Sequence, residues 1–351
     1  MTGGDLNRPE PIRRHHARPV DGNTPPRLAA KRLRDGEVQI VTDLYKTGAE
    51  ILAQLQELLP ALPQGADYAT RQEHRRTGRE AAMRLLAPIR DHCLDLQDAR
   101  TIGFLELLYP GLRRFSLPFV RVQELYGAWT RYEEGVHLAV LGHRVHPFYG
   151  TYAPTRTVHL ELFATWLSQY EGARTRAVDV GTGCGVLALM LGKARFEQVY
   201  ATDDNPNAIE SLAQELKRRT DAWPVSLSVC DLLGEGGPPM DLIVFNPPWM
   251  RGQAESLVER ALLFQDGLFE RFFEQASRRL APEGRVVMLF SNIMELVQPD
   301  EPHPIQTELD RGRFRLVQRL RRKVKPAPDE TGRVRRTRER VEVWELALAK
   351  G

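Results

Sequence analysis

The stretch Ala177-Val178-Asp179-Val180-Gly181-Thr182-Gly183-Cys184-Gly185-Val186-Leu187 places a glycine-rich turn between a predicted strand and a predicted helix. This order of strand, turn and helix separates a nucleotide-type binding turn from chance glycines. Glycine is needed because the backbone must turn tightly and a bulky ligand must lie against it without meeting a Cβ atom. In an open α/β sheet such a ligand lies at the carboxyl ends of the strands. An ordinary strand-to-helix loop is the alternative.

Two carboxylates downstream complete the predicted cofactor site. Asp203 ends a predicted strand 24 residues after Asp179, where its carboxylate can accept hydrogen bonds from two ribose hydroxyls. Asp231 follows the next strand and could accept from an adenine amino group, although an Asp there could also cap a helix. Together with the spacing GxGxG rather than GxGxxG, this set favours S-adenosylmethionine (SAM) over a dinucleotide. The predicted cofactor-binding residues are Asp179, Gly181, Thr182, Gly183, Gly185, Asp203, Asp231 and Asn246.

Short apolar runs alternate with amphipathic segments after Trp166. The predicted strands are 176–180, 198–202, 225–229, 241–245 and 284–290, and the predicted helices are 181–192, 206–219 and 267–280. This alternation is typical of a parallel sheet with helices on both faces. Two last runs, 314–324 and 340–349, predict a hairpin at the sheet edge. The predicted fold class is therefore α/β and Rossmann-like, mostly parallel with an antiparallel C-terminal hairpin.

The first 140 residues divide into two predicted segments. Residues 1–36 are rich in Pro, Arg, Gly and Asn and have little apolar periodicity, which predicts a flexible basic arm. Apolar residues recur at three- and four-residue steps over 38–62, 70–97 and 99–109, and this periodicity predicts helices. The predicted organisation is an arm (1–36), a helical N-terminal domain (37–140) and the α/β domain (141–351).

The fourth predicted strand ends in Asn246-Pro247-Pro248-Trp249. Two prolines exclude helix and sheet, so the chain leaves the strand in a stiff turn with unpaired carbonyl groups. A planar nitrogen could donate to Asn246 Oδ1 and to the Pro247 carbonyl while Trp249 stacks on it, and such catalysis requires alignment but no nucleophilic side chain. The predicted catalytic residues are Asn246, Pro247 and Trp249, and the predicted substrate contacts are Tyr149, Tyr152, Pro248 and Trp249. A rigid loop without catalytic function is the alternative.

Residues 150–349 resemble class I SAM-dependent methyltransferases of the (N/D)PP(Y/F/W) type, in particular the release-factor glutamine N-methyltransferases. The matching motifs are the glycine turn in Val178–Leu189, the ribose-binding Asp203, the NPPW tetrapeptide, Asp266-Gly267-Leu268, and Leu280-Ala281-Pro282-Glu283-Gly284. Residues 148–157 resemble the family's loop over the cofactor. Two departures are Thr155-Arg156-Thr157-Val158 in place of the family's Arg-Pro-Glu-Thr, and Trp249 in place of its usual Tyr.

The resemblance implies a methyltransferase that uses SAM and modifies a planar nitrogen. A protein side-chain amide of the glutamine type is the first expectation. The alternatives are the N6 amino group of adenine in RNA or DNA, a small molecule, and a non-enzymatic interaction module. The release-factor enzymes carry a helical N-terminal domain, which implies that residues 37–140 recognise the substrate.

Composition limits the partners and the location. The net charge is only +3, but residues 311–340 hold thirteen Lys or Arg against three Asp or Glu, so nucleic-acid contact there is an alternative to a solvated hairpin. Three cysteines without CxxC spacing and the absence of a long apolar stretch predict a cytoplasmic protein that does not span a membrane. His143 and His146 lack a third ligand at a suitable spacing, so no metal is expected. The oligomeric state is not predicted.

Overall fold

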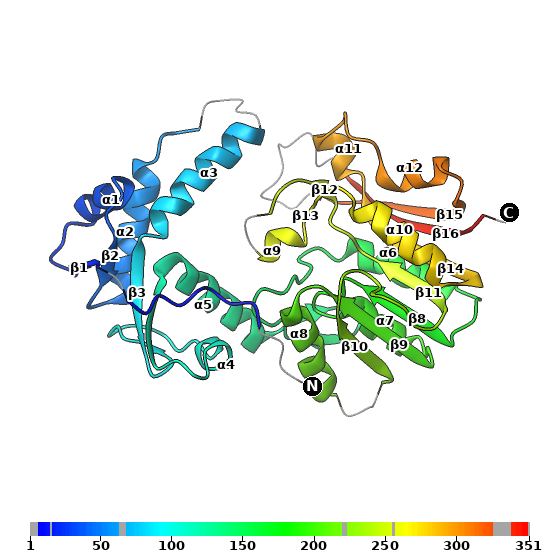
Figure 1. Cartoon of the computed structure of the whole chain (residues 1–351), viewed down its shortest axis with the longest axis horizontal. Helices are drawn as coiled ribbons and strands as arrows, with labels where there is room; N and C mark the ends of the chain where they lie inside the picture. The colour runs from blue at the N-terminus through cyan, green and yellow to red at the C-terminus, as the bar shows by residue number, and fades with distance from the viewer. Residues whose placement is uncertain are drawn as a thin grey trace. The chain divides into compact units, whose positions relative to one another are not determined.

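The structure is a computed structural model that describes residues 6–14, 16–62, 68–219, 223–254, 257–325 and 338–349. The chain divides into two compact units (Figure 1). One comprises Met1–Asn7 with Tyr132–Gly351, and the other comprises Arg8–Arg131. The division lies near residue 131 rather than at the predicted residue 140. Within the described ranges, no helix is both long and apolar enough to cross a membrane.

A seven-stranded sheet forms the centre of the larger unit, with the strand order β10-β9-β8-β11-β14-β16-β15. Its strands are β8 (Arg176–Val180), β9 (Gln198–Asp203), β10 (Val225–Val229), β11 (Met240–Phe245), β14 (Leu280–Ser291), β15 (Phe314–Lys323) and β16 (Arg340–Leu348). Neighbours from β10 to β14 are parallel, whereas β16 is antiparallel to both β14 and β15. The predicted Rossmann-like sheet and C-terminal hairpin are confirmed.

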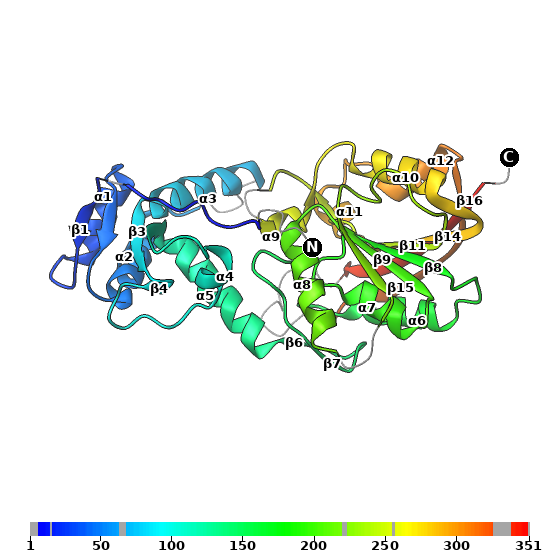
Figure 2. The ribbon, with the colours of Figure 1, turned by 60° about the horizontal axis from the view of Figure 1, so that its bottom comes forward.

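Helices cover both faces of this sheet (Figure 2). One face carries α6 (Val158–Ser168), α7 (Val186–Lys193) and α8 (Pro206–Lys217), and the other carries α10 (Leu268–Arg279), α11 (Ile293–Val297) and α12 (Pro304–Asp310). Side chains of successive strand residues point to opposite faces. In β11, Leu242 and Val244 accordingly pack with the first set of helices, and Ile243 and Phe245 pack with the second.

Two short pairs of strands complete this unit. The strands β6 (Val136–Leu138) and β7 (His143–Val145) form an antiparallel pair ahead of α6. After β11, the strands β12 (Met250–Arg251) and β13 (Leu263–Phe264) pair in parallel, with α9 (Leu257–Arg260) between them in the sequence. We refer to β12, α9 and β13 together as the β12–β13 segment.

The predicted site residues meet at one edge of the sheet because the parallel strands end there. Val180 at the end of β8 lies opposite Thr202 of β9 and Phe245 of β11. Because β16 runs in the opposite direction, its first residues lie at the same edge, where Val341 is opposite Ser291 at the end of β14. The glycine turn, the end of β11 and the start of β16 therefore share an edge.

The second unit is α/β rather than helical. Its strands are β1 (Arg18–Val20), β2 (Gln39–Val41), β3 (Leu85–Arg90), β4 (Cys93–Leu94) and β5 (Arg114–Pro118). Its helices are α1 (Pro26–Arg34), α2 (Tyr45–Leu58), α3 (Tyr68–Ala82), α4 (Phe104–Leu108) and most of α5 (Phe119–Glu134), whose last three residues belong to the larger unit. Helices are confirmed at α2 and α3. The prediction of helix over 70–97 is wrong beyond Ala82, because Pro88 cannot occupy a helix interior and β3 pairs with β2 and β5.

The prediction of a flexible arm over residues 1–36 is also wrong for much of its described part. Strand β1 pairs in parallel with β2. Helix α1 buries Ala29, Ala30 and Leu33 completely. These three apolar residues occur at helical spacing, but the surrounding Arg and Pro residues gave this segment the composition of a disordered one.

Candidate active site

A cavity of about 910 Å³ opens at the carboxyl edge of the seven-stranded sheet. Ligand-binding cavities typically measure roughly 300–1,000 Å³, so this one can hold a SAM-sized molecule and the reacting end of an acceptor. The predicted site residues that line it are Tyr152, Gly181, Thr182, Gly183, Asp203, Asp231, Asn246, Pro247, Pro248 and Trp249.

The glycine turn presents bare backbone to this cavity. Gly181 and Gly183 have φ angles of +64° and +54°. Residues other than glycine rarely adopt this backbone conformation. The Thr182 N–H donates to the Thr202 carbonyl at 2.9 Å and so fixes the turn to β9. A Cβ atom on Gly183 would lie 3.4 Å from the Tyr152 carbonyl oxygen, so the backbone at Tyr152 lies close to the glycine turn. These features fit the cradle that a nucleoside cofactor requires.

Asp179 supports the turn and does not line the cavity. It is fully buried, and its Oδ2 accepts hydrogen bonds from Thr182 Oγ1 at 2.7 Å and from the Ala188 N–H at 2.9 Å. Burial raises the pKa of this carboxyl to about 7, although the two hydrogen bonds act in the opposite direction. Its side chain therefore joins β8 to α7, in place of the predicted contact with the cofactor.

Gly185 likewise differs from its predicted role as a cofactor contact. It is the N-cap residue of α7 with a φ angle of +84°. A Cβ atom there would lie 2.4 Å from Cδ1 of Leu212, a residue of α8. The third glycine of the motif is thus required for helix packing, and it is not among the residues that line the cavity.

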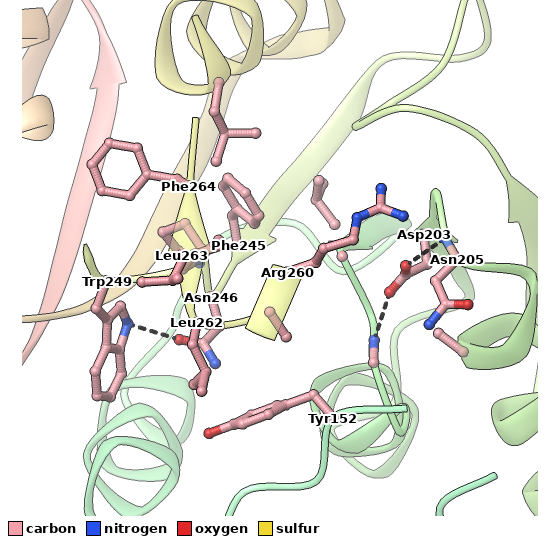
Figure 3. A pocket seen from close by; sticks show the side chains of 18 of the residues that line it. Tyr152, Asp203, Asn205, Phe245, Asn246, Trp249, Arg260, Leu262, Leu263 and Phe264 are labelled. Atoms are coloured by element: carbon pink, nitrogen blue, oxygen red, sulfur yellow. Dashed lines mark hydrogen bonds between the residues drawn. The ribbon is translucent and has the colours of Figure 1, made fainter. Parts of the chain in front are cut away.

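Asp203 lies at the end of β9 with its carboxylate at the cavity (Figure 3). Its Oδ2 accepts from the Gly183 N–H and its Oδ1 accepts from the Asn205 N–H, both at 2.9 Å. Burial raises the pKa of this carboxyl to about 6 against the effect of these two bonds. Each carboxylate oxygen can accept more than one hydrogen bond, so two ribose hydroxyls can still donate to Asp203.

Asp231 also lines the cavity, where Arg271 Nε donates to its Oδ2 at 3.3 Å. Residues 231–240 are all described and contain no helix, so Asp231 does not cap one. Its side chain is half exposed, which leaves acceptor positions for an amino group of the cofactor.

The NPPW turn holds its own asparagine in place. Trp249 Nε1 donates to Asn246 Oδ1 at 3.2 Å (Figure 3). It also donates to the Leu289 carbonyl at 3.2 Å. An indole N–H can only donate, so the bond to Asn246 fixes which end of that amide is the oxygen. One acceptor position of Oδ1 stays open for a substrate N–H. The indole thus orients Asn246, and stacking of Trp249 on the acceptor stays a prediction.

His159 was missed by sequence reasoning. It lines the cavity at 2% exposure, and its ring meets that of Trp249 edge to face at a centroid distance of 5.3 Å. Burial lowers its pKa to about 4, so the imidazole is neutral at physiological pH. Its Nε2 is buried and has no hydrogen-bond partner within the part of the chain that the structure describes. In the sequence it lies between apolar residues of a mainly apolar helix, which is the appearance of an ordinary core histidine.

The two predicted substrate tyrosines lie in different places. Figure 3 shows the Tyr152 ring extending across the cavity toward the side that carries Asn246 and Trp249, and burial raises the pKa of its hydroxyl. Tyr149 is buried and does not line the cavity, so its prediction as a substrate contact is wrong. Its carbonyl accepts from Asn207 Nδ2 at 2.8 Å, which fixes this part of the chain to α8.

The β12–β13 segment forms a further wall that no motif indicated. Leu257, Leu262 and Leu263 line the cavity with apolar side chains. Arg260 of α9 forms an ion pair with Asp204, the residue after the predicted ribose-binding carboxylate. The only signal for this wall in the sequence is its position directly after NPPW.

The two histidines considered for a metal have other partners. His146 Nδ1 lies 2.7 Å from the Tyr132 carbonyl, and His143 Nε2 lies 3.3 Å from Arg219 Nη1. No group of three His, Cys, Asp or Glu suited to a metal occurs within the ranges given above. Of the basic segment 311–340, residues 326–337 lie outside the described residues.

Comparison with known proteins identifies the class of this domain. Residues 160–299 match the family model described as the methyltransferase small domain. Over 121 residues the chain is 30% identical to a tRNA1(Val) (adenine(37)-N6)-methyltransferase of Tolumonas auensis, covering 32% of this chain and 50% of that protein. Over 141 residues it is 28% identical to a release factor glutamine methyltransferase of Streptococcus pneumoniae, covering 36% of this chain and 50% of that protein.

The chain spans about half the length of the curated relatives it matches. Among solved structures, the ribosomal protein L11 methylase of Lactobacillus delbrueckii subsp. bulgaricus has 17% identity and a TM-score of 0.40, covering 57% of this chain and 82% of that one. The family match and the sheet topology define a class I methyltransferase domain, and SAM is the cofactor of this domain. The predicted methyltransferase fold and SAM cofactor are confirmed for this domain, whereas the resemblance to the release-factor enzymes is confirmed only for methyltransferases in general.

Proposed function

We propose that this chain transfers the methyl group of SAM to a planar nitrogen. The observation that supports this most directly is the position of Asn246. Its side chain lies in the same cavity as the glycine turn and Asp203, and Trp249 Nε1 orients its oxygen from 3.2 Å. This supports the proposal, because an oriented hydrogen-bond acceptor in the same cavity as the glycine turn can hold an acceptor nitrogen near the cofactor.

The chemistry that this geometry favours is alignment. An NH₂ group on an sp² carbon can donate one N–H to Asn246 Oδ1 and the other to the Pro247 carbonyl. Its lone pair, which is normally delocalised into the planar group, is then directed out of that plane toward the methyl donor. SAM supplies an electrophilic methyl group on a sulfonium centre. A bond from nitrogen to carbon forms as the carbon–sulfur bond breaks, and the nitrogen loses a proton to water.

Two acceptor classes carry such a nitrogen. A glutamine-type side-chain amide is proposed from the resemblance to the release-factor enzymes, with the unit Arg8–Arg131 recognising the protein. Adenine N6 is the second candidate. The cations Lys323, Lys325, Arg338 and Arg340 at one end of the β15–β16 hairpin favour it. A purely non-enzymatic role does not need the glycine cradle, the oriented Asn246 and the open cavity that this chain retains.

Methyl transfer into a lysate of cells that lack this gene tests the proposal. The purified chain and SAM with a radiolabelled methyl group are added, and the labelled product is treated separately with protease and with nuclease. Label lost only to protease indicates an amide acceptor, label lost only to nuclease indicates adenine, and dialysable label indicates a small molecule. If the wild-type chain labels nothing in any fraction, the proposal is wrong.

Asn246→Ala tests the part played by the turn. We expect turnover to fall by about 10²–10³-fold while the affinity for SAM stays within about threefold, because alignment is removed and the cofactor cradle is kept. Labelled transfer and titration calorimetry measure the two quantities. Asn23→Ala, an exposed asparagine of the other unit, is the control and should change neither. Full turnover in Asn246→Ala would contradict the assignment of Asn246.

A further inference from the structure

The end of the β15–β16 hairpin at which residues 324–339 connect the two strands lies beside the acceptor end of the cavity. Lys323 at the end of β15 is opposite Arg340 at the start of β16, and Val341 is opposite Ser291 at the end of β14. Ile293 and Glu339, which flank these positions in the sequence, both line the cavity. In the strand order, β14, β16 and β15 lie on the side of β11 away from β8 and β9. A molecule that contacts this hairpin end therefore lies on the Asn246 side of the cavity, away from the strands that carry the cofactor cradle.

This hairpin end is strongly basic. We define the basic rim as Arg321, Lys323, Lys325, Arg338 and Arg340. Lys323, Lys325 and Arg338 are exposed, and none of them forms an ion pair with a carboxylate within the described ranges. Glu339 does not offset their charge, because it pairs with Arg156 at 3.2 Å.

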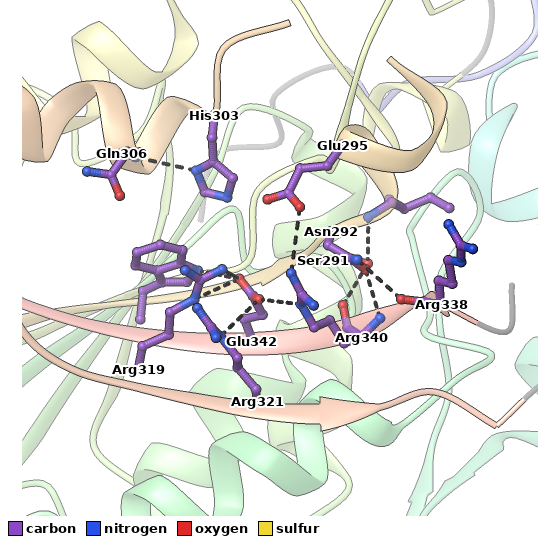
Figure 4. Close-up of polar contacts among 12 residues, drawn as sticks. Ser291, Asn292, Glu295, His303, Gln306, Arg319, Arg321, Arg338, Arg340 and Glu342 are labelled. Atoms are coloured by element: carbon purple, nitrogen blue, oxygen red, sulfur yellow. Dashed lines mark hydrogen bonds and ion pairs between the residues drawn. The ribbon is translucent and has the colours of Figure 1, made fainter. Parts of the chain in front are cut away.

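Part of the rim, at Arg338 and Arg340, is held in a fixed position (Figure 4). The completely buried Glu342 accepts from Arg319 Nε at 3.0 Å, from Arg340 Nε at 3.1 Å and from Trp344 Nε1 at 3.0 Å. Asn292 holds the backbone, since its Oδ1 accepts from the Arg340 N–H at 2.8 Å and its Nδ2 donates to the Arg338 carbonyl at 3.2 Å. The Arg340 side chain and the backbone at Arg338 are thus preorganised, and a ligand need not order them.

We propose that the basic rim binds the phosphates of a single-stranded RNA segment whose unpaired adenine enters the cavity. This inference rests on the proposed function, which requires an accessible planar amino group. Interfaces with nucleic acid are positively charged and polar, whereas the centre of a protein interface is apolar and depleted in Lys. RNA is favoured over DNA because adenines in its loops are already unpaired and unstacked.

The basic rim also has a purely structural explanation, because charged residues on an edge strand prevent strands of other molecules from pairing with it. That explanation accounts for Lys on β15. It requires neither Arg338 nor Lys325, which lie outside the strands β15 and β16, and it does not require that the charges gather at the cavity end. The two explanations also predict different responses to salt.

RNA binding by the full chain, measured by fluorescence anisotropy at several salt concentrations, tests the proposal. The probe is a labelled RNA hairpin with adenines in its loop. The test variant is Lys323→Gln/Lys325→Gln/Arg338→Gln. We expect it to bind at least tenfold more weakly at moderate salt and to lower the slope of log K against log salt by about 2, since each phosphate contact on a single strand contributes roughly 0.7.

The control variant Arg315→Gln/Lys217→Gln/Arg278→Gln removes the same charge from exposed residues away from the cavity edge. Arg315 is opposite Ala347 near the other end of β16, and Lys217 and Arg278 lie in the last turns of α8 and α10. We expect this control to retain nearly wild-type affinity. Equal slopes in the two variants, or a wild-type slope near zero, would overturn the proposal. The test variant could instead aggregate while its soluble fraction binds RNA with wild-type affinity. That outcome would overturn the proposal and support the explanation that the charges only protect the edge strand.

Two further measurements separate this inference from the proposed function. Normal labelling of a protein acceptor by the test variant, without RNA binding by the wild type, would retain the methyltransferase and overturn the RNA surface. RNA binding that depends on the basic rim, without methyl transfer to any acceptor, would retain the RNA surface and overturn the proposed methyltransferase function. A DNA hairpin of the same sequence is included, and tighter binding to DNA than to RNA would also count against the proposal.

Discussion

The hydrogen bonds predicted between Asp203, at the end of β9, and the two ribose hydroxyls require an ionised carboxylate. Burial raises its pKa to about 6, so protonation removes an acceptor within an accessible pH range. We expect the affinity for SAM to fall as the pH drops through 6, by about tenfold between pH 7 and pH 5, since a single group loses about ninety per cent of its ionised form over that interval. Titration calorimetry with SAM from pH 5 to pH 8 measures this.

Asp203→Asn is the matched control, because the amide keeps the size of the side chain but cannot ionise. We expect the variant to bind SAM more weakly and with little dependence on pH over the same range. A wild-type affinity that stays constant from pH 5 to pH 8 would show that ionisation of Asp203 is not required for cofactor binding.

A side chain at Gly185 would destabilise the fold in two ways, through the positive φ angle and through the clash with Leu212. Ala at this position must adopt a φ angle of +84° and must also displace Leu212, whereas Ala at Gly142 meets a φ angle of +79° with no atom within 4 Å. We expect Gly142→Ala to lower the free energy of unfolding by about 1 kcal/mol, and Gly185→Ala by about 1–3 kcal/mol more. Urea denaturation measures both. Equal losses would mean that the packing against Leu212 costs nothing.

The β15–β16 hairpin depends on a carboxylate that has no access to solvent. Glu342 is completely buried, and Arg319, which donates to it, has a side chain only 18% exposed. We expect Glu342→Ala to lower the free energy of unfolding by about 3 kcal/mol, because Arg319 is left as a buried unpaired charge. Glu295→Ala is the comparison, since Glu295 lies 3.8 Å from Arg340 and is 40% exposed. That variant should lose less than about 0.5 kcal/mol.

The elements that sequence predicts well are those whose cause is local. The turn after β8 is determined by glycines that must adopt positive φ angles, and the NPPW turn by prolines that cannot continue a strand. Strand β3 shows the opposite case. Its run Leu85–Ile89 is apolar throughout, and such a run fits either a buried strand or a buried helix segment until its partners are known. Those partners, β2 and β5, are distant in the sequence.

The same distinction applies to the active site. Asn246 and Trp249 were predictable because they are three residues apart, whereas His159 reaches the cavity from a helix that precedes the glycine turn. Tyr149 and Tyr152 could not be told apart in sequence. Gly150 between them has a φ angle of +68°, and the direction of the chain on either side depends on contacts with α8.

On the scale of the whole molecule, the two compact units each have a core of their own. The unit Arg8–Arg131 completely buries Leu33, Phe104 and Phe119, and every residue that lines the cavity belongs to the other unit. A ligand that binds only the native state of one unit stabilises that unit by an amount set by its concentration. SAM should therefore distinguish the two units in an unfolding experiment.

We expect calorimetry of the full chain to show two transitions, of which SAM shifts only one. At a hundred times its dissociation constant, SAM should stabilise the larger unit by about 2.7 kcal/mol, which corresponds to an increase in Tm of about 5–10 °C for a unit of this size. Asp203→Asn, with weaker binding, should give a smaller shift at the same concentration. A single transition that moves as a whole would show that the units unfold as one cooperative block. Two transitions that are both unchanged by SAM would contradict the assignment of the cavity.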